Sequence, residues 1–338
     1  MLCVESSYNN LYLLRMGEQK KVGFWSGHLG ERGTDVGMFN YAHYNEKILN
    51  NESIIFYPKK SKFNNSDVIE KFKTRFKVIG VDNFSQIDQF LINGNIKYFF
   101  NIKYGKNDNE ICNFAKNCIQ CVFTAKEPHG DVYCTIAKWV DGNHGKYPVI
   151  PRIISLPYHE MDMRSELGIP DNATVFGGYG GPTQFSIKMA QQAVYNTAKK
   201  RNDIYFLFAN FNKFCKELPN IIHLPCIVDL NEKVEFINTC DAMIWGRDDG
   251  ETFGQAIAEF SSKNKPVIAT DKKTTRRTFD KCHVYLLGNK AIWYDNQKNL
   301  EFILQNFDKD EMAKKDWNAY SDYTPEKVMK IFDEVFLK

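Results

Sequence analysis

The chain has 338 residues, of which 43% are hydrophobic and 25% are charged. This composition is typical of a globular protein with a sizeable core, and at about 150 residues per domain the length predicts two domains. The 44 Lys and Arg residues nearly balance the 41 Asp and Glu residues, for a formal net charge of +3. A balance so close to neutral argues against a nucleic-acid-binding protein.

The nine cysteines are odd in number and irregularly spaced, which favours a reducing compartment over a disulfide framework. Cys118 and Cys121 form a CxxC pair without a second pair or a histidine at zinc spacing, so we interpret them as core thiols. No apolar run reaches the roughly 18 residues that a membrane span needs, and residues 1–20 lack the apolar core of a signal peptide. We expect a cytoplasmic protein, at most peripheral to a membrane.

The first half of the chain alternates strand-like apolar runs with segments of helical spacing. The predicted strands cover 22–25, 54–57, 78–81, 98–102 and 119–124. Helical spacing is found at 36–43, 68–76, 87–92 and 111–118. Such alternation predicts a parallel sheet with helices on both faces.

A second cycle follows the proline-rich stretch 147–158, which cannot form one continuous helix. The predicted strands here are 174–178, 204–208, 221–224, 242–245, 266–270 and 291–294. The predicted helices are 187–200, 231–240, 253–262 and 300–307, followed by two tail helices that break near Thr324 and Pro325.

The fold class that follows is α/β, with two Rossmann-like doubly wound domains facing across a cleft. We place an N-terminal extension at 1–20 and a linker at 151–160. The first domain covers 21–150, and the second covers 161–310. Residues 311–338 are expected to form helices that pack across both domains.

The segment from Arg247 to Phe260 carries the most informative chemistry. A strand, a glycine-containing turn and a helix place backbone N–H groups at the carboxyl edge of the sheet, where the helix dipole favours an anion such as a diphosphate. Gly254 lets a ligand approach the backbone closely. Glu251 and Glu259 lie about 12 Å apart along a helix axis, so one can meet a sugar and the other a ribose. The alternative is an acid at a helix start and a surface glutamate.

This segment resembles the retaining glycosyltransferases of the GT-B fold known as family 4, whose hallmark is two glutamates separated by seven residues. Glu251-Thr252-Phe253-Gly254 matches the family's Glu-Gly-Phe-Gly with one change, and Glu259 has the required spacing. The chain is also similar to relatives in viral and bacterial glycan clusters, which share this block and Pro128-His129-Gly130-Asp131. The chain could itself be virus-encoded.

The resemblance implies transfer of a sugar from a nucleotide-diphosphate sugar to a glycan or other hydroxyl acceptor, with retention and without a metal or cofactor. Glu251 would contact hydroxyls of the donor sugar, and Glu259 the ribose hydroxyls. The amides of Phe253 and Gly254 would support the sugar and the phosphate. Arg247 would help to neutralise the diphosphate.

A glycine-rich turn at 177–183 follows the first strand of the second cycle. Such a turn can wrap a pyrophosphate with backbone amides, which makes Gly180 and Gly181 donor-binding candidates. The family usually has an arginine directly after this strand, and none is present here. The phosphate charge therefore falls to Lys188 and to Arg247.

Two segments of the first half are further candidates. In the loop 26–35 the glycines are each three residues apart, which is not the dinucleotide fingerprint, and the resemblance points to Gly33 and Thr34 as contacts of the donor phosphate or the acceptor. His129 resembles the family's cleft histidine, which approaches the transferred sugar. The alternative is a histidine bonded locally in its loop.

Two other functions stay open at this point. A Rossmann-type oxidoreductase would need the missing dinucleotide fingerprint. A non-catalytic nucleotide- or glycan-binding protein of the same fold is compatible with the missing arginine. Asp308-Lys309-Asp310 lies between predicted helices, so we interpret it as a helix cap rather than a metal clamp.

Overall fold

The computed structural model describes residues 19–30, 33–271 and 282–338. The chain divides into two compact units. Unit 1 comprises Met1–Cys121, Glu127–Cys134 and Met329–Lys338, and unit 2 comprises Val122–Lys126 and Thr135–Val328. All but the last two residues of the predicted extension 1–20 lie outside the described residues. The packing of the C-terminal segment across the domains, and the cleft between them, stay predictions.

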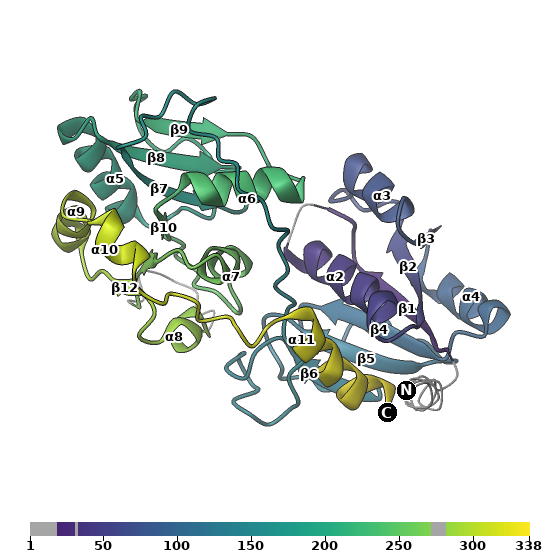
Figure 1. Ribbon diagram of the computed structural model, residues 1–338. Coiled ribbons are helices and arrows are strands. Elements are labelled where there is room, and N and C mark those ends of the chain that lie inside the picture. Colours follow the sequence, from purple (N-terminus) through teal and green to yellow (C-terminus); the bar gives the residue numbers. More distant parts are fainter. Residues whose placement is uncertain (1–18, 31–32, 272–281) are drawn as a thin grey trace, which may run out of the picture. The chain divides into compact units, whose positions relative to one another are not determined.

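Unit 1 is built on a parallel six-stranded sheet of order β3-β2-β1-β4-β5-β6 (Figure 1). Its strands are β1 (Lys21–Ser26), β2 (Glu52–Pro58), β3 (Lys77–Val81), β4 (Tyr98–Lys103), β5 (Lys116–Cys121) and β6 (Val132–Thr135). Its helical elements are α2 (Gly33–Lys47), α3 (Ser66–Lys73), η1 (Phe84–Gln86) and α4 (Ile87–Gly94). It also contains the second half of α11 (Pro325–Phe332) and all of η2 (Asp333–Leu337).

The sequence prediction for 111–118 was wrong, because this segment is not a helix. Asn117 explains the difference: its amide donates to the carbonyls of Cys112 at 2.9 Å and Ala115 at 2.8 Å. Local side-chain bonds of this kind offer the backbone an alternative to helical hydrogen bonds. β5 starts at Lys116, earlier than the predicted strand 119–124. The four-residue strand β6 was not predicted.

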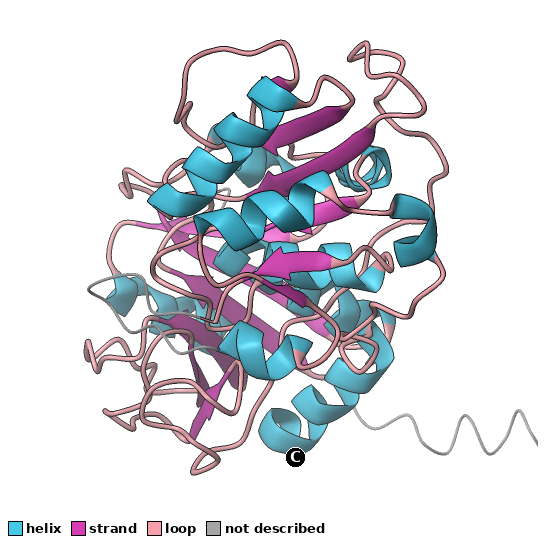
Figure 2. Ribbon diagram, turned by 90° about the vertical axis from the view of Figure 1, so that its left-hand side faces the viewer, coloured by secondary structure: helices cyan, strands magenta, loops and turns pink. Residues whose placement is uncertain are grey.

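Unit 2 repeats the plan with the order β12-β11-β10-β7-β8-β9, and helices lie on either side of its strands (Figure 2). All six predicted strands are present, as β7 (Thr174–Tyr179), β8 (Ile204–Ala209), β9 (Ile221–Leu224), β10 (Ala242–Ile244), β11 (Val267–Ala269) and β12 (Ile292–Trp293). The helices are α5 (Lys188–Lys200), α6 (Leu230–Thr239), α7 (Gln255–Ser262), α8 (Cys282–Leu287), α9 (Gln297–Gln305) and α10 (Lys309–Ala313).

The strand orders define where each sheet can bind a ligand. In unit 1 the chain runs outward from β1 to β3 and then returns to the other side of β1 as β4. In unit 2 it runs from β7 to β9 and returns beside β7 as β10. Ligands of open α/β sheets bind outside the carboxyl ends of the strands at such reversals. The loops after β1, β7 and β10 therefore occupy the ligand positions of the two sheets.

Several smaller predictions are confirmed. Cys118 and Cys121 are fully buried, and burial raises the pKa of the Cys121 thiol to about 12, so it stays protonated at neutral pH. Asp308 caps α10 by accepting from the amides of Asp310 at 3.1 Å and Glu311 at 3.0 Å. Pro325 is the first residue of α11.

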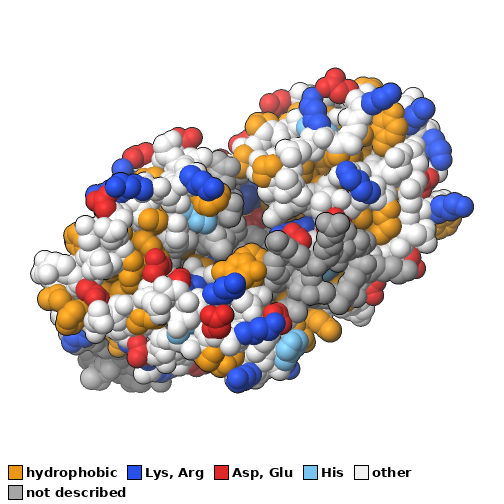
Figure 3. Space-filling view, turned by 180° about the vertical axis from the view of Figure 1, so that it is seen from behind, with side chains coloured by type: hydrophobic (Ala, Val, Ile, Leu, Met, Phe, Trp, Pro, Cys, Tyr) orange, Lys and Arg blue, Asp and Glu red, His pale blue; other side chains and the backbone are white. Residues whose placement is uncertain are grey.

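The described surface mixes both signs of charge. On the face shown in Figure 3, Lys and Arg side chains are spread among acidic and apolar ones. Among the described residues, no helix has both the length and the apolar character needed to cross a membrane.

Gly177 in β7 tests how tightly the sheet of unit 2 packs on α6. A Cβ at this position would lie 2.2 Å from Cys240 Sγ and 3.3 Å from the carbonyl oxygen of Leu207. Overpacking of this kind typically costs about 1–3 kcal/mol. We therefore expect Gly177→Ala to lower the free energy of unfolding by at least about 1 kcal/mol. Urea denaturation measures the change. The control is Gly27→Ala, because a Cβ at Gly27 has no neighbour within 4 Å; equal effects of the two would contradict the packing argument.

Candidate functional site

The loop between β10 and α7 holds Glu251 between two side-chain donors. Trp245 Nε1 donates to Glu251 Oε1 at 3.3 Å, and Arg247 Nη1 donates to Glu251 Oε2 at 3.0 Å. The side chains of Arg247 and Glu251 are each 17% exposed. Both oxygens are therefore fixed, while the pair stays accessible to a ligand.

The first turn of α7 has the backbone that the sequence predicts. Gly254 precedes the helix with φ 81° and ψ 67°, a left-handed conformation that favours glycine, and no side chain caps the helix start. Phe253 is buried, and its carbonyl oxygen accepts from the hydroxyl of Tyr320 at 3.1 Å. The phenyl ring thus anchors the loop in the core and sets the position of the backbone in front of α7.

Glu259 lies deeper, and its carboxylate has partners from three elements. The Tyr179 hydroxyl at the end of β7 donates to Oε2, and Gln255 Nε2 donates to Oε1 at 2.9 Å. Lys233 Nζ of α6 lies 3.5 Å from Oε2, and the side chains of Lys233 and Glu259 are 12% and 3% exposed. The alternative that Glu259 is a surface residue is therefore wrong.

Tyr179 completes this buried cluster. The Lys233 ammonium lies over the Tyr179 ring, 5.6 Å from its centroid. Burial raises the pKa of the Tyr179 hydroxyl well above its usual value, and the neighbouring Glu259 carboxylate adds to the effect. The hydroxyl is thus protonated at neutral pH and acts as a donor to Glu259.

The glycine-rich turn after β7 is held by side chains of its own unit. Gly181 donates its amide to Gln184 Oε1 at 2.9 Å, and the Gly180 carbonyl accepts from Asn210 Nδ2 at 2.8 Å. Lys188 is exposed at the start of α5 and donates to Gln191 at 3.2 Å.

Backbone contacts bring this turn to the loop after β10. The amides of Ser186 and Ile187 donate to the carbonyl of Gly246 at 2.7 and 2.9 Å, and the Asp248 amide donates to Ser186 Oγ at 3.0 Å. The loops that follow β7 and β10 are therefore joined at the point where the strand order reverses.

In unit 1, the predicted residues Gly33 and Thr34 open α2. Gly33 is exposed and Thr34 is half-buried. Next to them the structure places two residues that the sequence analysis did not single out as candidates, His28 in the loop and Asp35 in the first helical turn. His28 Nε2 and Asp35 Oδ2 lie 3.3 Å apart.

His129 lies in the segment between β5 and β6. Its Nδ1 is 2.7 Å from the carbonyl oxygen of Glu127, and its ring centroid is 5.5 Å from that of Tyr133. A carbonyl only accepts, so Nδ1 carries the proton in this contact. The geometry is that of a locally bonded histidine, and the contact with a transferred sugar stays a prediction.

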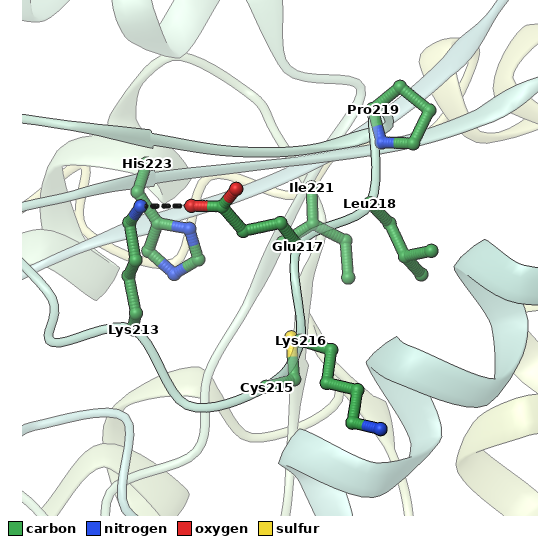
Figure 4. Close-up of a pocket in the computed structure, with 8 residues that line it drawn as sticks. All are labelled: Lys213, Cys215, Lys216, Glu217, Leu218, Pro219, Ile221 and His223. Atoms are coloured by element: carbon green, nitrogen blue, oxygen red, sulfur yellow. Dashed lines mark hydrogen bonds and ion pairs between the residues drawn. The ribbon is translucent and has the colours of Figure 1, made fainter.

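A separate cavity of about 380 Å³ lies along β9 in unit 2 (Figure 4). Lys213 and Glu217 point toward each other across it, with 2.6 Å between Nζ and Oε1. Burial lowers the pKa of His223 in its wall, with a further contribution from Lys213. The cavity is lined by Lys213, Cys215, Lys216, Glu217, Leu218, Pro219, Ile221 and His223. None of them is among the predicted site residues.

Two parallel α/β sheets of this kind, one in each unit, define the GT-B class of folds. A crystal structure of a glycosyltransferase from Rickettsia africae matches with a TM-score of 0.67 and 14% identity, over 94% of this chain and 99% of that one. Anabaena HepE in complex with UDP and glucose matches with a TM-score of 0.59 and 11% identity, over 94% and 98%.

A third match extends the comparison beyond transferases. The structure of a putative UDP-N-acetylglucosamine 2-epimerase from Listeria monocytogenes matches with a TM-score of 0.56 and 14% identity, over 94% of this chain and 97% of that one. No family model matches the chain. No curated protein matches it either. At these identities the likeness shows the fold alone.

The buried cluster around Glu259 generates a stability prediction. Glu259→Ala leaves the Lys233 ammonium without its carboxylate, and removing one partner of a buried ion pair typically costs about 3–5 kcal/mol. We expect a loss of that size in the free energy of unfolding, measured with urea. The double variant Lys233→Met, Glu259→Gln removes both charges and should recover part of the loss. If Glu259→Ala unfolds like the wild type, the cluster does not stabilise unit 2.

Proposed function

We propose that the chain is a glycosyltransferase that moves a sugar from a nucleotide-diphosphate sugar to a hydroxyl of a glycan or similar acceptor. The observation that carries the proposal is the position and pairing of the Glu251 carboxylate. This half-buried carboxylate is fixed by Trp245 and Arg247 at the carboxyl end of β10, beside the strand reversal. Carboxylates are strong hydrogen-bond acceptors, so Glu251 is suited to hold hydroxyls of a donor sugar.

The donor diphosphate belongs in front of α7. An uncapped helix start favours an anion through its backbone N–H groups and its dipole, and the left-handed Gly254 leaves the backbone open to close approach. Arg247 adds a guanidinium with five N–H donors, of which one is directed at Glu251. The remaining donors can bind phosphate oxygens in a bidentate manner, and Lys188 supplies a second positive charge.

This arrangement supports cleavage of the bond between the anomeric carbon and the diphosphate. Negative charge grows on the leaving phosphate as the sugar becomes oxocarbenium-like, and in this proposal Arg247, Lys188 and the α7 amides stabilise it. The resemblance to family 4 further predicts retention, in which the acceptor attacks from the face that the diphosphate leaves and a phosphate oxygen takes its proton. In this scheme Glu259 and the amides of Phe253 and Gly254 complete the donor site.

The likeness to HepE, whose structure holds UDP and glucose, supports a uridine nucleotide as the first donor to test. The likeness to a putative UDP-N-acetylglucosamine 2-epimerase supports a second candidate function, epimerisation of a nucleotide sugar. NMR of UDP-N-acetylglucosamine incubated with the protein alone separates the two. An epimerase changes the configuration of the sugar without an acceptor, whereas a transferase alone can only pass the sugar to water, which yields UDP and free N-acetylglucosamine.

The first experiment measures nucleotide binding by thermal shift. UDP, GDP, ADP and dTDP, and their glucose conjugates, are added at increasing concentration. A ligand at 100 times its dissociation constant stabilises the native state by about 2.7 kcal/mol, so one of the four bases should raise the melting temperature clearly. NAD is the comparison, because stabilisation by NAD alone would favour an oxidoreductase. If no nucleotide changes the melting temperature, the proposal is wrong.

Glu251→Gln tests the site itself. The substitution keeps the shape but removes the charge that holds Arg247, so we expect weaker binding of the sugar nucleotide and a loss of turnover of about 10²-fold or more. The matched control is Glu301→Gln in α9, where the carboxylate is 15% exposed and also paired, with Lys200 at 3.7 Å. If both variants retain wild-type turnover, Glu251 is not part of the site. Nucleotide binding without any turnover in the wild type would favour the non-catalytic alternative.

A further inference from the structure

Gln255 is the first residue of α7, the helix in front of which the proposed function places the donor diphosphate. The residue is half-buried. Its Nε2 donates to Glu259 Oε1 at 2.9 Å. Its Oε1 is buried and accepts no hydrogen bond from the described residues. One branch of the side-chain amide is therefore paired, and the other is not.

Glu259 determines which branch of the amide is the carbonyl. The oxygen and the nitrogen of a glutamine are assigned from their partners, because either atom fits either place. The Glu259 carboxylate is surrounded by donors, since the Tyr179 hydroxyl and the Lys233 ammonium also face it. An ionised carboxylate only accepts, so the NH₂ group of Gln255 must face Glu259. The buried acid thus fixes the carbonyl of Gln255 as a free acceptor at the start of α7.

The start of α9 provides an internal comparison. Its first residue, Gln297, donates through Nε2 to Glu301 Oε1 four residues later, also at 2.9 Å. This helix is capped, since Asn296 Oδ1 accepts from the Asn299 amide at 3.0 Å. The Gln297 carbonyl oxygen is not among the buried side-chain atoms that lack a partner in the described part of the chain. Of the two matching pairs, the one at Gln255 leaves a buried acceptor unsatisfied, at a helix start without a side-chain cap.

An unpaired buried acceptor is costly for the folded protein. The Gln255 carbonyl oxygen has lost its hydrogen bonds to water and has gained none in the protein. A ligand that brings an O–H or N–H group to this oxygen removes the cost, so the site favours such a ligand. The ionised oxygens of a diphosphate cannot pair with it, because they only accept hydrogen bonds. The partner must therefore come from another part of the donor.

We propose that Gln255 Oε1 accepts a hydrogen bond from a ribose hydroxyl of the donor nucleotide. This inference rests on the proposed function and adds a specificity-determining residue to its donor site. In that scheme Glu251 holds the hydroxyls of the transferred sugar and the α7 amides hold the diphosphate. The ribose follows on the other side of the diphosphate and supplies the O–H group.

The same contact gives Glu259 its part in the donor site. The Glu259 side chain is 3% exposed, and both of its oxygens already have donors. It therefore serves the ribose through Gln255, which it orients, and keeps its buried partners when the donor binds. A site built to pair with a hydroxyl rejects an analogue that lacks it, because the polar group of the protein then stays unpaired. The loss of one such hydrogen bond corresponds to about a tenfold change in the dissociation constant.

The experiment compares wild type with Gln255→Leu by isothermal titration calorimetry. The titrants are whichever of UDP, GDP, ADP and dTDP binds best in the thermal-shift screen, and its counterparts that lack a further hydroxyl of the pentose. For wild type we expect a dissociation constant about tenfold higher for at least one counterpart. Gln255→Leu has no acceptor, so it should bind the complete nucleotide about tenfold more weakly, and the ratio between the two forms should fall to within about twofold of one. A merely structural defect weakens both forms alike and leaves the ratio unchanged.

The matched control is Gln297→Leu. It removes the same kind of pair from a helix start, with Glu301 in place of Glu259, and should keep the wild-type ratio. Gln255→Lys is the second variant, because its ammonium still donates to Glu259 but cannot accept from a hydroxyl. Its positive charge strengthens binding of both nucleotide forms alike, so the ratio should still fall. If Gln255→Leu fails to fold, Gln255→Lys decides.

The outcomes separate this inference from the proposed function. If no nucleotide stabilises the wild type, the proposed function fails, and the ribose contact with it. If a nucleotide binds but the wild type binds its counterparts equally well, only the inference about Gln255 is overturned. Gln255 variants that keep the wild-type ratio overturn it as well. A changed preference among the four bases with an unchanged ratio assigns Oε1 to the base, which also contradicts the ribose contact.

Discussion

Partly or fully buried carboxylates at the strand ends are the constraint on which both units depend. A carboxylate removed from water must be paired or hydrogen-bonded, and its partners are then held in place with it. Glu259 fixes Tyr179 and Lys233, Glu251 fixes Arg247 and Trp245, and Asp35 draws in His28. Each acid thereby orders side chains beyond its immediate neighbours in the sequence.

The topology explains why each of these acids lies at or beside the ligand position of its own sheet. Parallel strands of one sheet all end on the same edge, and the reversal of strand order separates two neighbouring helices there. Polar side chains are needed at such an edge because backbone groups at strand ends and helix starts lack partners within the sheet. The contacts of Ser186 and Ile187 with Gly246 show how two loops at the edge of unit 2 complete each other.

The sequence allowed much of the fold to be predicted, because buried parallel strands are continuous apolar runs. The strand-turn-helix pattern around Glu251 and Gly254 was visible for the same reason. Lys233 could not be found this way, since it reads as an ordinary charged residue on an amphipathic helix and its partner Glu259 is distant in sequence. His28 and Asp35 were missed because the resemblance pointed to Gly33 and Thr34 in this loop. The error at 111–118 arose from Asn117, whose side-chain bonds no periodicity reveals.

Tyr179 bears on the missing arginine after β7. It ends that strand, where the family 4 resemblance leads one to expect a cation, and its hydroxyl donates to Glu259 instead. The positive charge of this region comes from another element, because Lys233 of α6 lies over the Tyr179 ring and beside Glu259. That ammonium is committed to the buried acid. In the proposed function the donor diphosphate is therefore neutralised by other groups, namely Arg247, the first turn of α7 and Lys188 at the start of α5.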